Sequence, residues 1–298
     1  SLLLALLLSA FAGCGISDNE SEPQLRFSQI YDNGLIGQDY FPLDVIQTPD
    51  QGYLVLAASN DWDIYLLKAD SAGVFDWERP LSEPYVNAVP QLITDGANTY
   101  FFCMDEVSLE TYLMRVDESG NDPEEFLRYP DIQYPLAASQ TDQGQVLLLG
   151  YDRVVRNTQL NLLNASFTEV WDEGYPVFTD VEEPIIGHLT RTGDRLPFFT
   201  GESTQGFFFN AFRNFSMSLV FVNSATGEQT GVISGFREEE SIAAASVLPG
   251  GTYGMARYSF GDSYLLPSTG LDPNAEAISN ELGGFELPEL DTSLPVIT

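Results

Sequence analysis

The sequence is poor in basic residues, and this limits the partners that it can have. Of its 298 residues, 44 are Asp or Glu and 12 are Lys or Arg, so the net charge is −32, and Lys68 is the only lysine. A field of that sign repels phosphate backbones, which excludes DNA or RNA as a partner. We expect the acidic residues to form a solvated surface that keeps the protein soluble. Adaptation to high salt is the alternative explanation.

Cysteine and histidine are also scarce. The two cysteines, Cys14 and Cys103, provide no disulfide framework. Cys103 lies in an apolar segment, 100–104, and we expect it to be a small buried hydrophobic residue. His188 is the only histidine, which excludes a multi-histidine metal site within one chain. Its apolar surroundings favour a core or rim position over the role of base in a Ser–His–Asp triad.

Long apolar runs are absent apart from one at the N-terminus. Residues 2–12 are apolar except for Ser9, which is too short for a spanning helix of about 20 residues but matches the apolar region of a signal peptide. The segment 11–14, Phe-Ala-Gly-Cys, resembles a lipobox, although it has Phe11 where Leu is usual. This resemblance implies a signal peptide over 1–13, a lipidated Cys14 and an acidic tether over 14–24. The missing start methionine indicates that the sequence is cut at its front.

Two series of turn residues recur along the chain in step with each other. The first turn of each unit carries Asp, Gly or Pro between apolar runs, which is a hairpin signal. Its members are 45, 47, 52 and 56 residues apart, at Asp50, Asp95, Asp142, Asp194 and Gly250. In the second series, Asp70, Asp117 and Asn164 are 47 residues apart, followed by the turns at Asn223 and 267–270. Two independent series with one period indicate an internal repeat.

A period near 47 residues with four short strands per period predicts a β-propeller. The propeller domain is expected over 25–298, with copies at about 39–82, 83–130, 131–177, 178–236 and 237–288. Segment 25–31 resembles a last strand, and 290–298 resembles the start of another copy. We therefore expect an all-β propeller of about six four-stranded blades, with five or seven as alternatives, and a sequence that is truncated at both ends.

The first copy resembles a known repeat. It contains Asp50-Gln51-Gly52-Tyr53, then Tyr65-Leu66-Leu67-Lys68, then a glycine turn that leads to Phe75-Asp76-Trp77. This unit looks like the repeats of secreted and lipid-anchored propeller proteins of Bacteroidota, a family whose known functions are few. Trp77 and Trp171 end their copies, so we predict that both are largely buried between blades. Trp62 should be more exposed.

Acidic residues offer candidates for catalysis and for metal binding. Pairs of carboxylates could hydrolyse glycosides, and the candidates near blade edges are Asp61, Asp63, Asp180, Glu182 and Glu183. Oxygen ligands for Ca²⁺ cluster at 117–122 and 60–63, but neither segment has the spacing of an EF-hand loop. Turns contain such residues for backbone reasons, so we expect no catalytic residue, no cofactor and no metal ligand, with Ca²⁺ as the alternative.

The fourth copy is unusually rich in phenylalanine. Three consecutive Phe side chains, 207–209, cannot all face one side of a strand. Either both faces are buried between blades, or some rings form an exposed contact patch. The buried interpretation is favoured. The candidate partner surface under the other interpretation consists of Phe207, Phe209, Phe212, Arg213 and Phe215.

Together these patterns predict a lipid-anchored binding or scaffold module of the bacterial envelope. The location would be the outer membrane or the cell surface, with membrane contact only through the lipid at Cys14. The partner would be an unidentified protein or glycan, and the function would be carried by loops on a rigid frame. The alternative is a carbohydrate-active propeller enzyme, a glycoside hydrolase or lyase, that uses Asp/Glu pairs.

Overall fold

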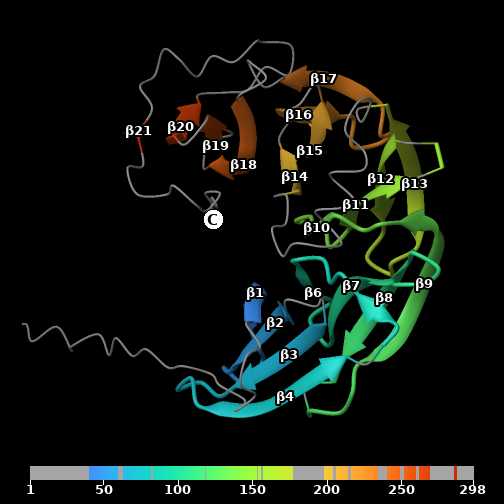
Figure 1. Cartoon of the computed structure of the whole chain (residues 1–298), viewed down its shortest axis with the longest axis vertical. Coiled ribbons are helices and arrows are strands. Elements are labelled where there is room, and N and C mark those ends of the chain that lie inside the picture. The colour runs from blue at the N-terminus through green and yellow to red at the C-terminus, as the bar shows by residue number, and fades with distance from the viewer. Residues whose placement is uncertain are drawn as a thin grey trace, which may run out of the picture. The chain divides into compact units, whose positions relative to one another are not determined.

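The computed structural model describes residues 40–59, 63–81, 83–117, 119–152, 154–155, 157–176, 198–203, 206–213, 216–233, 240–248, 252–259, 262–268 and 285–286. All regular secondary structure within these ranges is β-strand (Figure 1). The strands form five antiparallel sheets, and consecutive strands are hydrogen-bonded neighbours in every sheet except the second, where the first two short strands both pair with the third. The expected all-β architecture of four-stranded units is therefore confirmed.

The first two sheets contain nine strands. The first sheet consists of β1 (Tyr40–Gln47), β2 (Tyr53–Ser59), β3 (Ile64–Ala69) and β4 (Phe75–Leu81). In the second sheet the first strand is split into two short pieces that both pair with the next strand. Its strands are β5 (Tyr85–Val86), β6 (Leu92–Thr94), β7 (Thr99–Asp105), β8 (Glu110–Val116) and β9 (Glu124–Gln133).

The other three sheets have four strands each. The third sheet consists of β10 (Ala137–Gln140), β11 (Val146–Asp152), β12 (Asn157–Leu163) and β13 (Glu169–Tyr175). The fourth consists of β14 (Thr200–Ser203), β15 (Gly206–Arg213), β16 (Ser216–Val222) and β17 (Gln229–Ile233). The fifth consists of β18 (Glu240–Leu248), β19 (Thr252–Ser259), β20 (Asp262–Ser268) and β21 (Phe285–Glu286).

Each sheet corresponds to one expected copy of the repeat. The first strand of each sheet begins, and the last one ends, inside the matching copy, except that β9 extends to Gln133. The segments expected to complete a sixth blade, 25–31 and 290–298, lie outside the described residues.

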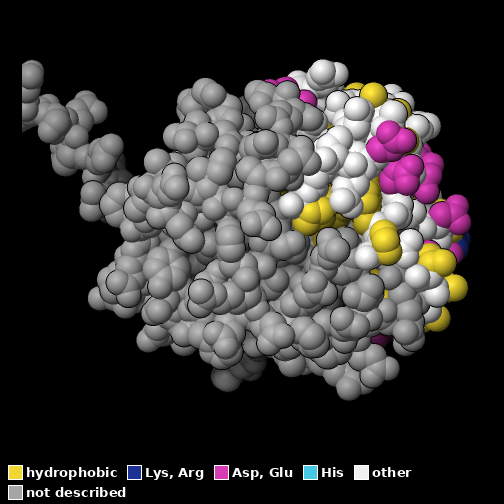
Figure 2. Space-filling model, turned by 90° about the horizontal axis from the view of Figure 1, so that it is seen from above, with side chains coloured by type: hydrophobic (Ala, Val, Ile, Leu, Met, Phe, Trp, Pro, Cys, Tyr) yellow, Lys and Arg dark blue, Asp and Glu magenta, His cyan; other side chains and the backbone are white. Residues whose placement is uncertain are grey.

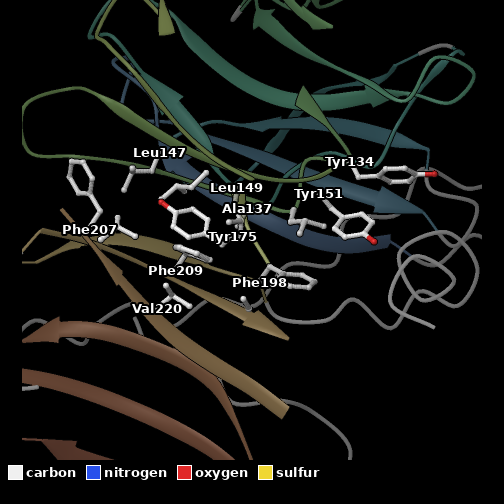
Figure 3. Packing of buried hydrophobic residues seen from close by; sticks show 14 of the residues in the cluster. Tyr134, Ala137, Leu147, Leu149, Tyr151, Tyr175, Phe198, Phe207, Phe209 and Val220 are labelled. Atoms are coloured by element: carbon white, nitrogen blue, oxygen red, sulfur yellow. The ribbon is translucent and has the colours of Figure 1, made fainter. Parts of the chain in front are cut away.

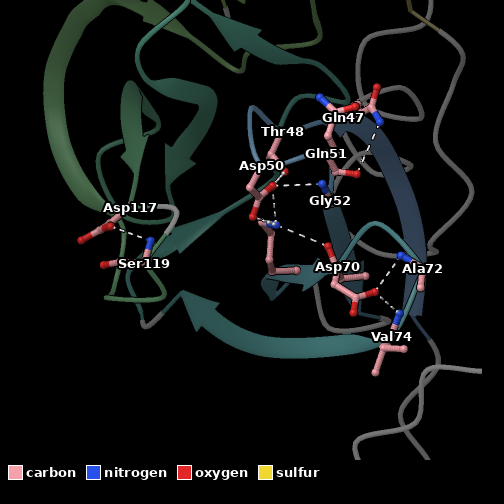
Figure 4. A network of polar contacts seen from close by, with 12 residues as sticks. Gln47, Thr48, Asp50, Gln51, Gly52, Asp70, Ala72, Val74, Asp117 and Ser119 are labelled. Carbon is pink, nitrogen blue, oxygen red and sulfur yellow. Dashed lines mark hydrogen bonds and ion pairs between the residues drawn. The ribbon is translucent and has the colours of Figure 1, made fainter.

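The second series of turn residues owes its regularity to a side-chain hydrogen bond. In the turn between β3 and β4, Oδ1 of Asp70 accepts hydrogen bonds from the backbone N–H groups of Ala72 (2.9 Å) and Val74 (2.8 Å) (Figure 4). Asp117 accepts one from Ser119 in the second sheet, Asn164 accepts two in the third, and Asn223 accepts one in the fourth. Only a short side chain with an acceptor oxygen can close this turn, which explains why Asp and Asn recur there.

The hydrophobic cores lie between consecutive sheets. One cluster joins the first and second sheets, another joins the second and third, and a third joins the third and fourth. In the last of these, Tyr175 of β13 packs on Phe209 of β15 with ring centroids 4.8 Å apart (Figure 3). Cys103 has an exposed fraction of 0% within the first cluster, as expected, and burial raises the pKa of its thiol.

The same contact recurs where each of the first three sheets meets the next. Trp77 of β4 lies on Gly120, Phe126 of β9 lies against Phe167, and Trp171 of β13 lies on Gly227. Gly120, Phe167 and Gly227 all occupy the left-handed position of the turn that leads into the last strand of their sheet. Trp77 and Trp171 are half-buried, so they pack between sheets as predicted but are less buried than the sequence indicated.

A hydrogen bond accompanies each of these aromatic contacts. The side chains of Arg79, Tyr129 and Tyr175 donate to the backbone carbonyl oxygens of Gly120, Phe167 and Gly227, respectively. The donor always comes from the same strand as the aromatic residue, and for Tyr129 the O–O distance is 2.7 Å. We call this arrangement the intersheet latch. It fixes each sheet to the next through a turn that the repeat itself supplies.

Candidate binding groove

An open groove lies at the end of the second sheet where two of its turns meet. Its volume is about 680 Å³, and it lies between the turn that joins β6 to β7 and the turn that joins β8 to β9. It is lined by Ala97, Asn98, Arg115, Val116, Asp117, Asn121, Asp122 and Glu124. A second hollow of about 290 Å³ shares Ala97 and Asn98 with it and continues to the turn between β1 and β2 of the first sheet. We call the two together the turn-end groove.

Asp95 shapes one wall of the groove. Its carboxylate accepts hydrogen bonds from the N–H groups of Ala97 (2.8 Å) and Asn98 (2.7 Å) and from the hydroxyl of Tyr100 (2.9 Å). Burial alone would raise the pKa of this carboxyl, but these hydrogen bonds outweigh burial and lower the pKa to about 2. The Asp95 carboxylate is therefore charged at any pH near neutral and holds this wall of the groove in place. The side-chain amide of Asn98 also donates to this carboxylate.

The opposite wall presents both signs of charge. Arg115 forms an ion pair with Glu124, and its guanidinium carbon lies 5.6 Å from the centroid of the Phe126 ring. The Asn121 amide donates to Oδ2 of Asp117 at 2.6 Å. This hydrogen bond, with those from Ser119, lowers the pKa of Asp117. Amides, carboxylates and one guanidinium thus face the groove with planar hydrogen-bonding groups.

The turn between β1 and β2, which borders the groove on the side of the first sheet, is held in place by the only lysine, Lys68. The Lys68 side chain has an exposed fraction of 2%, and its Nζ lies 2.8 Å from Oδ2 of Asp50. Gly52 leaves the space for it, because a Cβ there would come within 2.4 Å of that Nζ. The hydrogen bonds from Lys68, Thr48 and Gly52 lower the pKa of Asp50 (Figure 4). The turn that borders the groove on this side is consequently tied to β3.

Some acidic side chains lie together on the described surface (Figure 2). In the view of Figure 2, Asp and Glu side chains gather next to one another, with little basic side chain beside them. Within the described ranges, no three His, Cys, Asp or Glu side chains are close enough together to hold a metal ion. The two oxygens of Asp117, the first residue of the 117–122 calcium candidate, accept hydrogen bonds from its own turn.

The favoured interpretation of the fourth copy, in which the Phe side chains are core, is confirmed for Phe207 and Phe209, and the alternative partner surface is wrong at these two residues. Phe207 and Phe209 of β15 have exposed fractions of 3% and 0% and belong to the core between the third and fourth sheets. Phe208 is also buried, on the other face, where its ring lies 6.3 Å from Phe221. Because the sheet is covered on both faces, alternate and consecutive Phe side chains can all be core. The side chains of Phe212, Arg213 and Phe215 lie outside the described residues.

Most of the other sequence candidates are not placed by the structure. Cys14, Asp61, Asp180, Glu182, Glu183 and His188 all lie outside the described residues. Asp63 is half-buried directly before β3. Of the residues that line the turn-end groove, only those of the 117–122 calcium candidate were considered from the sequence, and the groove itself was not identified. The signal that could have found it is the coincidence of two Asp-Asn turns, 95–98 and 117–121, in one copy.

No helix in the described part of the chain is long and apolar enough to cross a membrane. This result does not bear on residues 1–13, which are outside that part.

Comparison with known proteins supports the fold alone. No family model and no curated protein matches the chain. Among solved structures, a catalytically inactive virginiamycin B lyase from Staphylococcus aureus with quinupristin has a TM-score of 0.52 and 11% identity, over 86% of this chain and 73% of that one. A protein of unknown function from Bacteroides caccae has a TM-score of 0.42 and 14% identity, over 74% and 69%. The chain therefore has a β-propeller-like fold.

Proposed function

We propose that this protein is a lipid-anchored binding module of the bacterial envelope, and that its turn-end groove holds a hydroxyl-rich ligand such as a glycan. The groove carries the proposal, because planar amide, carboxylate and guanidinium groups from two turns converge on an open space of about 680 Å³. Such groups can replace their hydrogen bonds to water by hydrogen bonds to the hydroxyl groups of a ligand at little cost in free energy. They also fix the orientation of the ligand and give the site its specificity.

The frame beneath the groove suits a binding role. The Asp95 turn, the Asp117 turn and the Asp50–Lys68 pair are each held by several hydrogen bonds. A site that is already organised loses little conformational entropy when a ligand binds. The strong net negative charge, −32, disfavours anionic ligands and favours neutral or cationic ones.

Anchoring rests on the sequence, where 11–14 resembles a lipobox after an apolar run. Expressed in a bacterium behind a complete signal peptide, the protein should fractionate with membranes, and Cys14→Ser should release it. Retention of the Cys14→Ser protein in the membrane pellet would contradict lipid anchoring. Fractionation should be done at low and high salt, because salt screens electrostatic attachment to a membrane surface but does not weaken anchoring by buried acyl chains.

A glycan array followed by titration tests the groove. We expect one class of oligosaccharide to bind. Asn98→Ala and Asp122→Ala should each raise the Kd for this oligosaccharide by about tenfold or more. Asp142→Ala is the matched control, because Asp142 is an exposed carboxylate in the corresponding first turn of the third sheet and does not line the groove. Equal loss in all three variants would contradict the groove assignment.

The same ligands should be assayed for turnover. Cleavage of a bound glycan would favour the carbohydrate-active enzyme over the binding module. In that case Asp180→Asn and Glu182→Gln would be the first substitutions to test.

A further inference from the structure

The turns between the second and third strands of the sheets carry exposed apolar tips. In the second sheet, Val107 lies between β7 and β8 with an exposed fraction of 86%. In the third sheet, Val154 and Val155 lie between β11 and β12 with exposed fractions of 84% and 64%. Valine is disfavoured in turns, so its presence at these points is not explained by turn formation.

Both turns are held rigidly by an aspartate. Oδ1 of Asp105 accepts hydrogen bonds from the N–H groups of Val107 (2.9 Å) and Ser108 (2.7 Å). Oδ1 of Asp152 accepts them from Val154 (2.7 Å) and Val155 (3.0 Å) in the same way. Each aspartate closes its turn by accepting backbone hydrogen bonds, so formation of the turn does not require the exposed valine side chains.

The turns at the other end of the same sheets have a different composition. Their central residues are small or polar in the described sheets, at Ser71 and Ala72, Ser119, Ala165 and Ser166, and Ser224 and Ala225. Val74, the last residue of the first of these turns, is an exception with an exposed fraction of 53%. In the sequence, the remaining turns between second and third strands contain Trp62, Phe215 and Phe260, whose structure lies outside the described residues. All five such turns therefore contain Trp, Val or Phe.

The tips of the second and third sheets project from the same end. At one end, the Tyr100 ring of the second sheet lies 4.8 Å from the Phe167 ring of the third. At the other end, Met104 and Leu109 of the second sheet share a core cluster with Tyr151 of the third. The two sheets are thus aligned, and Val107, Val154 and Val155 lie on one side. We call these three residues the apolar turn end.

We propose that the apolar turn end inserts into the interfacial region of a neutral phospholipid bilayer. The inference rests on the proposed lipid anchor, which would bring the domain to a membrane. The valine side chains of the apolar turn end are aliphatic and exposed on two separate turns, and they do not line the turn-end groove. A bilayer accommodates such side chains one by one, whereas a protein interface concentrates them in a packed centre.

The charges around these tips also favour a neutral bilayer. Arg153 and Arg156 flank the two valines in sequence, whereas the exposed Glu106 precedes Val107. Arginine beside an apolar group is suited to the level of lipid phosphates. The net charge of −32 opposes binding to anionic membranes. Trp and Phe, which occupy the corresponding turns in the sequence, are residues that favour membrane interfaces.

Quenching by brominated lipid tests the contact. The lipidated mature protein, which begins at Cys14, is added to phosphatidylcholine vesicles with plain or brominated acyl chains, as wild type and as Val107→Trp, Val154→Trp and Ala72→Trp. We expect bromine to lower the fluorescence of the tryptophan added at Val107 or Val154 by about twofold or more. Ala72→Trp is the control, because Ala72 is an exposed tip at the opposite end, and its added tryptophan should not be quenched.

The outcomes separate this proposal from the anchoring on which it rests. A chain that pellets with vesicles but shows equal quenching at Val107 and Ala72, or none at either, overturns the tip contact and leaves the anchor intact. A chain that does not pellet counts against both. Near-ultraviolet circular dichroism confirms that each variant is folded. If Val107→Asp abolishes self-association in the absence of vesicles, the surface is an interface between copies, and the lipid proposal is wrong.

Discussion

Trp77 of the first sheet lies directly on Gly120 of the second. A Cβ at Gly120 would come within 3.1 Å of Cδ1 of the indole, and the backbone there has φ of +87°. The Arg79 guanidinium lies 5.9 Å from the centroid of the indole ring and donates to the Gly120 carbonyl oxygen. A glycine that the repeat supplies for turn geometry is therefore also the point on which the neighbouring sheet rests.

The first prediction separates these two roles of Gly120. Gly120→Ala should lower the free energy of unfolding by about 1–2 kcal/mol for the left-handed backbone and by about 1–3 kcal/mol more for crowding the indole. Gly96→Ala is the matched control, because Gly96 has the same φ of +87° and nothing lies within 4 Å of its missing Cβ. Equal destabilisation of the two variants in urea titrations would show that the contact with Trp77 contributes nothing.

The second prediction concerns the latch between the second and third sheets. Phe167 has φ of +60° where Gly120 and Gly227 provide glycine, and its ring contacts Phe126 and Tyr100. Phe167→Ala should cost about 3–5 kcal/mol, because it removes a buried ring while keeping the backbone strain. Phe167→Gly should be closer to wild type than Phe167→Ala. The reverse order would contradict the view that strain at this position is offset by ring packing.

The third prediction follows from the tyrosines of the latch. Burial raises the pKa of Tyr129 and of Tyr175, with smaller contributions from Glu169 and Glu173. Since the folded state holds these hydroxyls protonated, their contribution to stability is full below the unfolded pKa of about 10 and is lost as the pH rises above it. Tyr129→Phe and Tyr175→Phe should each cost about 1 kcal/mol at pH 7 and weaken the loss of stability at alkaline pH. Urea titrations between pH 7 and pH 11 measure both effects.

The fourth prediction concerns the buried lysine. Asp50→Asn removes the carboxylate that faces Lys68 and should destabilise the fold by about 1–3 kcal/mol, because a buried ammonium loses its charged partner. Lys68→Met should cost less, since the remaining Asp50 side chain has an exposed fraction of 61% and stays hydrated. The pKa of Asp50 is lowered by the lysine, so the stabilisation is present above the unfolded pKa of about 3.9 and is lost as the pH falls through the lower folded pKa. Equal stabilities of the two variants at pH 7 would contradict this account.

Much of the architecture could be predicted because it depends on short-range chemistry. Asp70, Asp117 and Asn164 recur at 47-residue steps because each closes its own turn with its own side chain. Local signals of this kind can be recognised in a single sequence. The alternation of short apolar strands with such turns was enough to predict four-stranded antiparallel units.

The groove, the latch and the apolar turn end depended on contacts between distant residues. Nothing near Arg115 in the sequence shows that its guanidinium faces the turn of Asp95 and Asn98 across the sheet, because that proximity is set by strand pairing. Phe207 and Phe209 illustrate the same limit. Their hydrophobicity was visible, but whether they lie at a surface or in a core was decided by the third sheet, which covers them with Tyr175 and its neighbours. The sequence by itself determined which residues turn and which form strands, since those choices are local. The tertiary structure alone decided which faces are covered, because coverage is a property of the neighbouring sheet.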